Sequence, residues 1–303
     1  MKIGDLSSGE LAHRLRDPGI CLQTGPFLTH LRTPIPLLAR AMQFLYPDFN
    51  IEAPGQLVDF HICVDRPKNL RRWMRPQAQF YLEGNTPSNP MPLRLAVPLL
   101  EWGMNWAVAR NAYRFVVVHA AVAEKAGRAL MLIAPPGTGK STLCAALVYR
   151  GWRLFSDELL LIRLDDGRIV PLPRPIGLKN ESIAVIREFA PHAGMSPEWK
   201  DTHKGTVAHL RPPRDAVQRA GDTAMPGWIL FLTYRPGDRT RLEPVPKARA
   251  FLRVADSAFN YSELGLRGFE TVADLIDACD CYEFSYSRLD EAVERLSGLG
   301  IPG

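Results

Sequence analysis

The residues best suited to chemistry form a short run between positions 134 and 141. Ala134-Pro-Pro-Gly-Thr-Gly-Lys-Ser141 follows the apolar run 129–133 and precedes a segment with helical composition, 141–150. Gly137 and Gly139 allow the backbone to turn its N–H groups toward phosphate oxygens. A lysine at a helix N-terminus then reaches the β and γ phosphates, and a serine hydroxyl binds Mg²⁺. The pattern predicts a nucleotide phosphate loop made by Pro136, Gly137, Thr138, Gly139, Lys140, Ser141 and Thr142.

Two adjacent carboxylates follow this loop. The run 152–156 predicts a short strand, and Asp157 and Glu158 lie at its end. Open α/β sheets bind ligands at the carboxyl ends of their strands, so both acids are expected beside the phosphates. The short spacing predicts that this strand is next to the loop strand. We expect Asp157 to accept a hydroxyl proton as general base and Glu158 to bind Mg²⁺ together with Ser141.

A histidine precedes the loop on a second β-rich segment. His119 lies in the run 114–123, and a turn at 124–128 joins this run to the loop strand. So few connecting residues require an antiparallel hairpin. A histidine in such a strand is either a packed core residue or, at this strand end, a group that orients Asp157 and tunes its pKa.

Further polar residues follow a predicted hairpin, 159–172, whose turn is Asp165-Asp-Gly167. Arg174 is a candidate transition-state clamp, and Lys179 a candidate phosphate ligand. Asn180 is placed to cap the helix predicted at 181–189. For Arg174 and Lys179 an ordinary structural role is an equal alternative. The segment His203-Lys-Gly205 predicts a loop that either closes on a substrate or simply lies on the surface.

The composition bounds the class of protein. The chain has 303 residues, 46% hydrophobic and 23% charged, which is usual for a folded protein and excludes disorder. No apolar run is long enough for a membrane span or a signal peptide, so we expect a cytoplasmic protein without a membrane partner. The net charge of +5 is dispersed, with arginines clustered at 71–75 and 211–219. Because acids, prolines or a tryptophan interrupt both clusters, we expect solvated surface and no nucleic-acid partner.

The cysteines and the local patterns define the organisation. Five cysteines without a CxxC pair exclude a zinc ribbon and a disulfide framework. We expect a mixed α+β N-terminal region at 1–90 and a P-loop catalytic domain at 91–303. The expected elements outside the site are a helix at 36–45, strands at 57–64 and 78–82, a loop at 84–90, and helices at 99–110, 269–279 and 289–296, the last with a capping box at 287–290.

The residues around the loop resemble the catalytic domain of HPr kinase/phosphorylase over about residues 115–162. The resemblance is carried by the hairpin with His119, the loop 134–141, the segment Tyr149-Arg-Gly-Trp-Arg153 and the acidic pair. A closer resemblance, over most of the chain, is to the bacterial group called HprK-related kinase A. It rests on the segments Leu100-Glu-Trp-Gly103, Pro173–Ser182, Lys204–Pro213 and Ala258-Phe-Asn-Tyr261.

The resemblance implies an α/β fold, the phosphoenolpyruvate-carboxykinase-like P-loop kinase fold, which has a strand antiparallel to the loop strand. It implies ATP and Mg²⁺ as cofactors, with His119 assisting the acid–base pair, Lys140 on the phosphates and Ser141 on the metal. Asp157 matches the proton-accepting aspartate of the family. Glu158 matches its second acid, which is an aspartate in the parent family.

The acceptor implied by the resemblance is a hydroxyl, in the parent family a serine of a small phosphocarrier protein. The parent's later glycine-rich signature is missing beyond residue 165, so that substrate and the reverse phosphorolysis stay open here. Related kinases serve peptide-modification pathways beside a PqqD-like peptide-binding chaperone. The resemblance therefore implies a peptide or small-protein acceptor and a PqqD-like partner, and leaves a homo-oligomer open.

Two other functions remain as alternatives. The first is a small-molecule P-loop kinase, although such enzymes usually begin with the loop strand, which here follows a long N-terminal region. The second is a non-catalytic nucleotide-binding scaffold. That reading predicts loss of Lys140, Ser141 or Asp157, and all of them are present.

Overall fold

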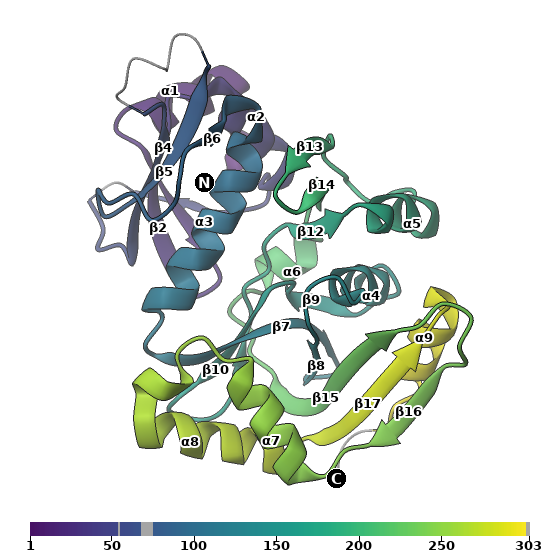
Figure 1. Cartoon of the computed structure of the whole chain (residues 1–303). Coiled ribbons are helices and arrows are strands. Elements are labelled where there is room, and N and C mark those ends of the chain that lie inside the picture. The colour runs from purple at the N-terminus through teal and green to yellow at the C-terminus, as the bar shows by residue number, and fades with distance from the viewer. Residues whose placement is uncertain (54, 68–74, 301–303) are drawn as a thin grey trace.

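The structure is a computed structural model that describes residues 1–53, 55–67 and 75–300. It is an α/β protein, with helices packed on three β-sheets (Figure 1). Arg71 and Arg72 of the first arginine cluster lie outside the described residues. Within the described residues, no helix combines the length and the hydrophobicity needed to cross a bilayer.

The N-terminal layer consists of a sheet and the helices that cover it. Its elements are η1 (Ile3–Asp5), α1 (Ser8–Arg16), β1 (Ile20–Thr24), β2 (Phe27–Arg32), α2 (Pro36–Leu45), β3 (Ile51–Glu52), β4 (Phe60–Asp65), β5 (Gln77–Leu82), β6 (Met91–Pro92), η3 (Leu93–Leu95) and α3 (Ala96–Asn111). The strand order is β3-β1-β2-β4-β5-β6. Strand β6 pairs with β5, and α3 packs on β5 and β4, so the apolar core of this layer continues past residue 90. The division into 1–90 and 91–303 stays a prediction.

Local sequence patterns correctly predict the elements of this layer that have a clear start signal. The predicted helix at 36–45 is confirmed as α2, with Pro36 in its first turn. The helix at 99–110 is confirmed as the longer α3, and the strand at 78–82 as β5. The strand predicted from residue 57 begins only at Phe60, because Leu57 is 98% exposed and pairs with no strand. Leu57, two residues after Gly55, is apolar but does not belong to the core strand.

The central sheet carries the phosphate loop. Its strands and the helices around it are β7 (Phe115–Lys125), β8 (Arg128–Ile133), α4 (Lys140–Val148), β9 (Arg153–Ser156), β10 (Leu159–Arg163), β11 (Ile169–Val170), α6 (Arg214–Gln218), β15 (Met225–Tyr234), β16 (Arg241–Pro244), α7 (Lys247–Asp256), α8 (Tyr261–Asp277), β17 (Asp280–Tyr286) and α9 (Leu289–Ser297). The order is β11-β10-β7-β8-β15-β17-β16, and β9 also pairs with β7.

The predicted antiparallel hairpin before the loop is confirmed as β7 and β8. Ala126 and Gly127 connect the strands with φ angles of +52° and +78°. Two consecutive positive φ angles are typical of the tight hairpin turn that matches the twist of its strands. The second predicted hairpin is confirmed as β10 and β11.

The strand that carries the acids is not next to the loop strand, contrary to our prediction. Strands β9 and β10 both pair antiparallel with β7, which also pairs with β8. Strand β7 therefore lies between the phosphate loop and the acidic pair. Strands β9 and β10 pair with the same strand, β7, one after the other. Asp157 and Glu158 form the break between them. At this interruption the amide of Ala120 donates to the carbonyl of Glu158 at 3.2 Å.

Helices cover both faces of the central sheet. Helices α4 and α9 pack on one face, and α7 and α8 on the other (Figure 1). The predicted helix at 289–296 is confirmed as α9, but its capping box is wrong, because Ser287 donates to the carbonyl of Asp238 instead. Helix α8 begins at Tyr261, before the predicted start at 269. Gly265, with a φ of +56°, bends the helix. The sequence pattern therefore predicts only the part of the helix that follows the bend.

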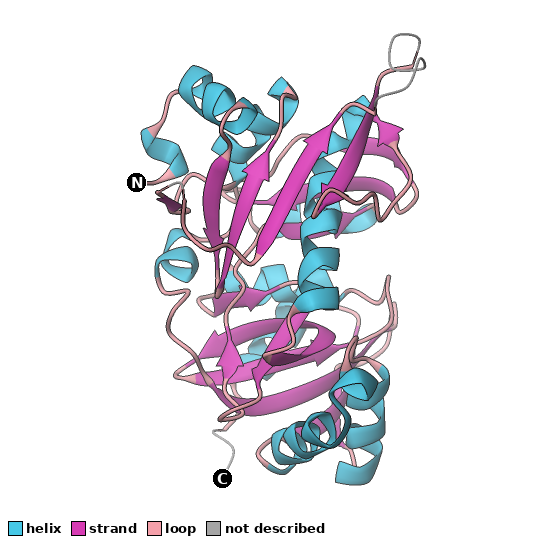
Figure 2. Ribbon diagram, turned by 90° about the vertical axis from the view of Figure 1, so that its left-hand side faces the viewer, coloured by secondary structure: helices cyan, strands magenta, loops and turns pink. Residues whose placement is uncertain are grey.

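A small sheet lies beside α4 and close to α3 (Figures 1 and 2). It contains β12 (Ile176–Lys179), β13 (Trp199–Thr202) and β14 (Gly205–Leu210), with α5 (Glu181–Phe189) following β12. Helix α5 has the predicted bounds, but Asn180 does not cap it. The side-chain oxygen of Asn180 instead accepts a hydrogen bond from the amide of Thr206 at 3.0 Å. This ties the end of β12 to the start of β14.

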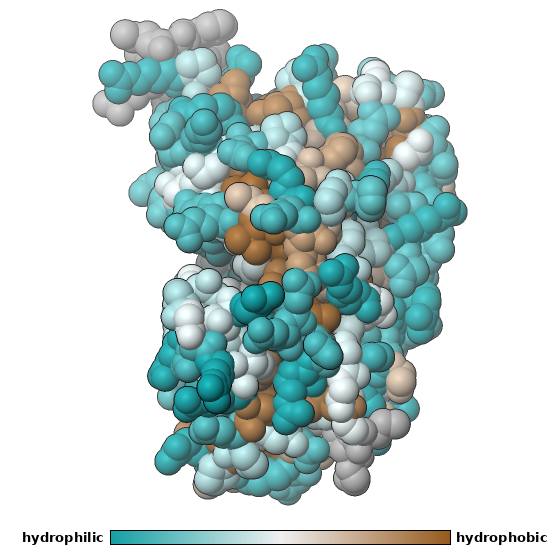
Figure 3. All heavy atoms as spheres, turned by 90° about the vertical axis from the view of Figure 1, so that its right-hand side faces the viewer, coloured by the Kyte–Doolittle hydropathy of each residue, from teal (hydrophilic) through white to brown (hydrophobic). Residues whose placement is uncertain are grey.

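Hydrophilic side chains cover most of the face shown in Figure 3. Hydrophobic ones gather near the middle of this face, where the N-terminal layer meets the rest of the chain. One pocket of the candidate site lies between α3 of the N-terminal layer and the small sheet.

Candidate functional site

The phosphate loop has the predicted strand–loop–helix form. It connects β8, which ends at Ile133, to α4, which begins at Lys140. Gly137 and Gly139 have φ angles of +87° and +86°, a backbone conformation that favours glycine. A Cβ on Gly139 would also lie 2.6 Å from the hydroxyl of Tyr286, which donates to the carbonyl of Gly139 at 3.2 Å. The first turn of α4 thus offers free N–H groups to an anion.

The other predicted loop residues lie at the same end of the helix. Pro136 is exposed, and Ser141 and Thr142 are half-buried in the first turn of α4. Thr138 donates its hydroxyl to the carbonyl of Pro135 at 2.7 Å, which closes the loop on itself. The backbone between these residues is left open to solvent, as a phosphate ligand requires.

Lys140 is buried in an unusual way for a lysine. It is 7% exposed, and its ammonium has no hydrogen-bond partner among the described residues. Burial lowers its pKa, while the nearby charges of Glu158 and Asp157 oppose that shift. A buried ammonium without a partner is costly, because it has lost water and gained no hydrogen bond. The space beside it therefore suits a bound anion.

Asp157 is the second buried group with an unused polar atom. It is 4% exposed, and its Oδ2 accepts from the amide of Gly177 at 2.8 Å. Its Oδ1 is buried and forms no hydrogen bond within the described part of the chain, although the nearby Ser141 hydroxyl lowers the pKa of the carboxyl group. Burial, and then the charge of Glu158, raise the pKa of Asp157 to about 7. A carboxyl group with this pKa can accept a proton near neutral pH.

Glu158 is surrounded by groups that carry or can take up positive charge. Its Oε2 lies 3.6 Å from Nδ1 of His119, and its Oε1 lies 3.9 Å from Nζ of Lys179. Burial and the charge of Lys140 lower the pKa of His119 to about 4, although Glu158 opposes the shift. The ring is therefore neutral at physiological pH. The structure places it next to Glu158 rather than in a direct contact with Asp157.

One segment distant in sequence, residues 257–260, holds His119 in place. On β7 its amide donates to the carbonyl of Ser257 at 2.8 Å, and its ring meets Phe259 edge-on at 6.1 Å. Asn260 is 3% exposed and forms two hydrogen bonds with β7. Its Oδ1 accepts from the amide of Val117, and its Nδ2 donates to the carbonyl of Phe115. These contacts fix the strand on which the ring sits.

Arg174 does not point at the loop, which corrects our prediction of a transition-state clamp. It is 5% exposed, and its Nη2 lies 2.6 Å from Oε2 of Glu101 on α3. Its Nη1 donates to Oδ1 of Asn105 at 2.6 Å. Tyr46 donates to the other oxygen of Glu101 at 2.6 Å. A guanidinium used in this way joins the N-terminal layer to the start of β12 and is not free to bind a transferring phosphoryl group.

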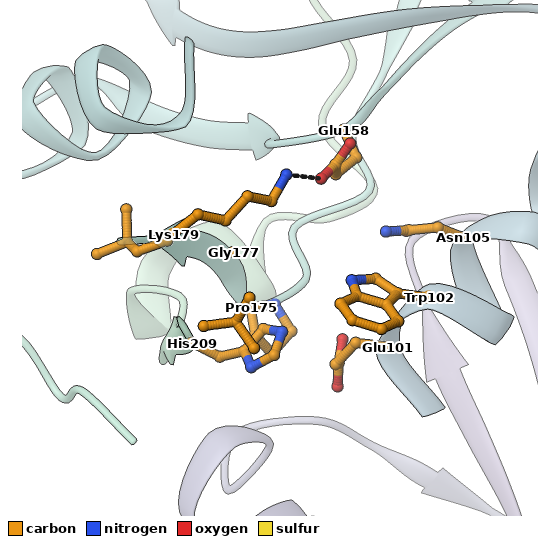
Figure 4. A pocket seen from close by; sticks show the side chains of 10 residues that line it. Glu101, Trp102, Asn105, Glu158, Pro175, Gly177, Lys179 and His209 are labelled. Atoms are coloured by element: carbon orange, nitrogen blue, oxygen red, sulfur yellow. Dashed lines mark ion pairs between the residues drawn. The ribbon is translucent and has the colours of Figure 1, made fainter. Parts of the chain in front are cut away.

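The cations that do face the acidic pair are lysines. Lys179 ends β12 and reaches Glu158, as Figure 4 shows. Lys204, in the loop between β13 and β14, lies over the ring of Trp102 at 4.9 Å. Partial burial and the charge of Lys179 lower the pKa of Lys204, and the charge of Glu158 opposes the shift. Sequence reasoning named both lysines only as alternatives to surface residues.

A pocket opens beside Glu158, between α3 and the small sheet (Figure 4). The residues that line it are Glu101, Trp102, Asn105, Glu158, Pro175, Gly177, Leu178, Lys179, Val207 and His209. Sequence reasoning missed Trp102 and Asn105 as site residues. They belong to a helix with an ordinary core pattern, and no local signal relates them to the phosphate loop.

Comparisons with known proteins give little further information. No family model matches the chain, and no curated protein does. A solved structure, the Hpr(Ser) kinase/phosphatase from Coxiella burnetii, matches with 12% sequence identity and a TM-score of 0.27, over 60% of this chain and 91% of that one. A TM-score this low does not establish a common fold. The function has to be argued from the site.

Proposed function

We propose that this chain is an ATP- and Mg²⁺-dependent kinase of the HprK-related kinase A type. The reaction is transfer of the γ-phosphoryl group to a hydroxyl, in the first place a serine, of a peptide or small protein. One observation carries the proposal: Lys140 Nζ and Asp157 Oδ1 are buried without hydrogen-bond partners among the described residues, at the end of a phosphate loop. Leaving such atoms unpaired costs about 1–3 kcal/mol each, and more when they are charged. Phosphate and metal would remove that cost.

The phosphate loop holds the nucleotide in this proposal. Backbone N–H groups from Gly137 to Ser141 bind phosphate oxygens, and the helix dipole of α4 adds to the attraction. Lys140 pairs with the β and γ phosphates. Ser141 and Glu158 would hold Mg²⁺, which when bound neutralises charge on the phosphate oxygens. The oxygen ligands of the site are of the kind that Mg²⁺ prefers.

Asp157 is the general base of the proposed reaction. It accepts the proton of the acceptor hydroxyl as the hydroxyl oxygen bonds to the γ phosphorus. The bond from that phosphorus to the bridging oxygen breaks, and Lys140 stabilises the charge that develops there. A pKa of about 7 suits a base that must be deprotonated near neutral pH and still bind a proton. His119, neutral beside Glu158, fixes the position of that second carboxylate.

Glu158 is the alternative base within the same proposal. It lines the pocket beside α3, whereas Asp157 does not. Exchange of the two roles would place Asp157 on the metal next to Ser141. The two assignments predict different defects in the corresponding amide variants, which are compared in the Discussion.

The remaining parts of the proposal concern fold and partners. Strand β7, antiparallel to the loop strand, supports the phosphoenolpyruvate-carboxykinase-like P-loop kinase fold. We propose the N-terminal region as the part that contacts the substrate or a PqqD-like peptide-binding partner, in a cytoplasmic protein without nucleic-acid or membrane partners. A homo-oligomer is compatible with the proposal. A small-molecule kinase and a non-catalytic nucleotide-binding scaffold are the rival functions that the first experiment has to separate.

The test is ATP-dependent labelling of candidate acceptors. The protein is incubated with Mg²⁺, [γ-³²P]ATP and peptides encoded beside its gene, and mass spectrometry locates the phosphate. We expect label on a peptide hydroxyl with wild type and with the control Lys200→Ala, whose lysine is exposed on β13, but none with Lys140→Ala. Label only on small metabolites would favour the small-molecule kinase. Nucleotide binding without any transfer would favour the scaffold.

A further inference from the structure

The pocket beside Glu158 has walls from two parts of the chain. Trp102 and Asn105 project from α3 on one side, and Lys179 and His209 come from the small sheet on the other, with Glu158 at the far end (Figure 4). Gly177 also lines the pocket, and its amide donates to Asp157. The pocket therefore reaches Glu158 directly, and Asp157 lies behind Gly177. An acceptor in this pocket would reach the reacting groups from the side opposite to the phosphate loop strand.

Positive charge dominates the mouth of this pocket. Lys179 lies 3.9 Å from Glu158, and Lys204 lies over the Trp102 ring. His203 also contacts that ring, with 4.5 Å between the ring centres. The other acid of the pocket, Glu101, is already paired with Arg174 and accepts from Tyr46. Lys179 is paired with Glu158, whereas Lys204 forms no ion pair among the described residues, so its positive charge is left for a ligand.

The polar atoms of the interior are free to bind a ligand. His209 is 3% exposed, and its Nδ1 is buried with no hydrogen-bond partner among the described residues. Asn105 uses its oxygen for Arg174, and its amide nitrogen points into the pocket (Figure 4). Buried polar atoms in folded proteins nearly always have partners, so an unused one in a pocket wall is available to a ligand.

We infer that this pocket is the acceptor subsite and that it takes a serine side chain flanked by acidic residues in a peptide. This inference rests on the proposed function and adds the chemistry of its substrate. The serine hydroxyl extends past Gly177 toward Asp157 and Glu158. A neighbouring aspartate or glutamate side chain pairs with Lys204 and Lys179 at the mouth, where Trp102 keeps Lys204 in place. Helix α3 of the N-terminal layer is then a specificity element.

The experiment compares matched serine peptides with Glu, Gln or Lys next to the serine. Transfer from Mg²⁺·ATP is measured for wild type, Lys204→Gln and the control Lys200→Gln. We expect wild type and the control to prefer the Glu peptide, and Lys204→Gln to raise KM for that peptide by about tenfold, the loss of one charge-assisted contact. KM for ATP and the thermal midpoint should stay unchanged. The Gln peptide should show no difference between the variants.

Binding of the same peptides without nucleotide separates this inference from the kinase proposal. Binding of the Glu peptide that Lys204→Gln weakens, without any transfer, would support the subsite and refute the kinase. Transfer that is equal for all three peptides and insensitive to Lys204→Gln would refute the subsite and keep the kinase. Better labelling of free serine than of any peptide would overturn the peptide assignment.

Discussion

The substitution Asp157→Asn tests the central electrostatic argument. Burial, and then the charge of Glu158, raise the pKa of Asp157 from 3.8 to about 7 in the folded protein. Between these values the folded protein holds a proton that the unfolded chain has released, so stability falls as pH rises and levels off above about pH 7. The difference corresponds to a cost on the order of 4 kcal/mol for the ionised form. Asparagine carries no charge and keeps an oxygen for the amide of Gly177.

The assay is urea unfolding of wild type and variant at several pH values without nucleotide. We expect Asp157→Asn to be more stable than wild type at about pH 8, by up to about 4 kcal/mol, with the gain shrinking toward pH 4. His119 acts in the opposite direction. Its pKa is lowered to about 4, so it makes stability rise with pH up to about 6.5. This contribution is present in both proteins and cancels in their difference. Equal stability of wild type and variant at every pH would refute the argument that ionisation of the buried Asp157 carboxylate costs free energy of folding.

The same variant separates the two candidate bases. With Asp157 as base, Asp157→Asn should lower kcat by about 10²–10⁴-fold and leave KM for ATP near its wild-type value. The matched variant Glu158→Gln should then mainly weaken Mg²⁺-dependent nucleotide binding. The reverse pattern, with loss of Mg·ATP binding in Asp157→Asn and loss of kcat in Glu158→Gln, would assign the base to Glu158.

Five further variants give distinct outcomes. Lys140→Ala should abolish transfer without lowering the thermal midpoint, and wild-type turnover would contradict the phosphate-loop assignment. His119→Ala should shift the pH–rate profile at a near-normal midpoint, whereas an unmoved profile with a lowered midpoint would make the residue structural. Gly139→Ala should weaken ATP binding more than Gly137→Ala, because only the first would meet Tyr286, and equal effects would exclude that contact. Glu101→Gln should lower stability by about 3–5 kcal/mol, measured by urea unfolding, and an unchanged stability would contradict the buried ion pair.

The phosphate loop and the elements around it could be predicted from sequence because their signals are local. Two glycines before a lysine, a short turn between apolar runs and a proline at a helix start each act over a few residues. This explains why α2, the β7–β8 hairpin and α5 appear where we expected them. The same local patterns predict helix caps wrongly where the side chains have other partners. Asn180 and Ser287 resemble helix caps, yet both bind distant backbone groups.

The strand order and the pocket could not be read from the sequence, because both depend on pairing between distant segments. Nothing in the short run from the loop to Asp157 shows that β7 lies between β8 and β9. Trp106 of α3 is 42% exposed, while Trp102 four residues earlier lies in the pocket wall. A helical pattern shows which residues share a face, but not which second element that face will meet.

The buried link from α2 to β12 explains why an N-terminal layer is joined to a phosphate-binding sheet. Tyr46 donates to Glu101, and Glu101 pairs with Arg174. Arg174 stands at the start of the segment whose Gly177 amide donates to Asp157. A buried ion pair contributes little net stability, because desolvation offsets its attraction, but removal of one partner is costly. Such a pair therefore selects one relative arrangement of the elements that it joins, and adds little to the stability of the fold. Here that arrangement determines where α3 stands relative to the carboxylate of Asp157, and so the shape of the pocket between them.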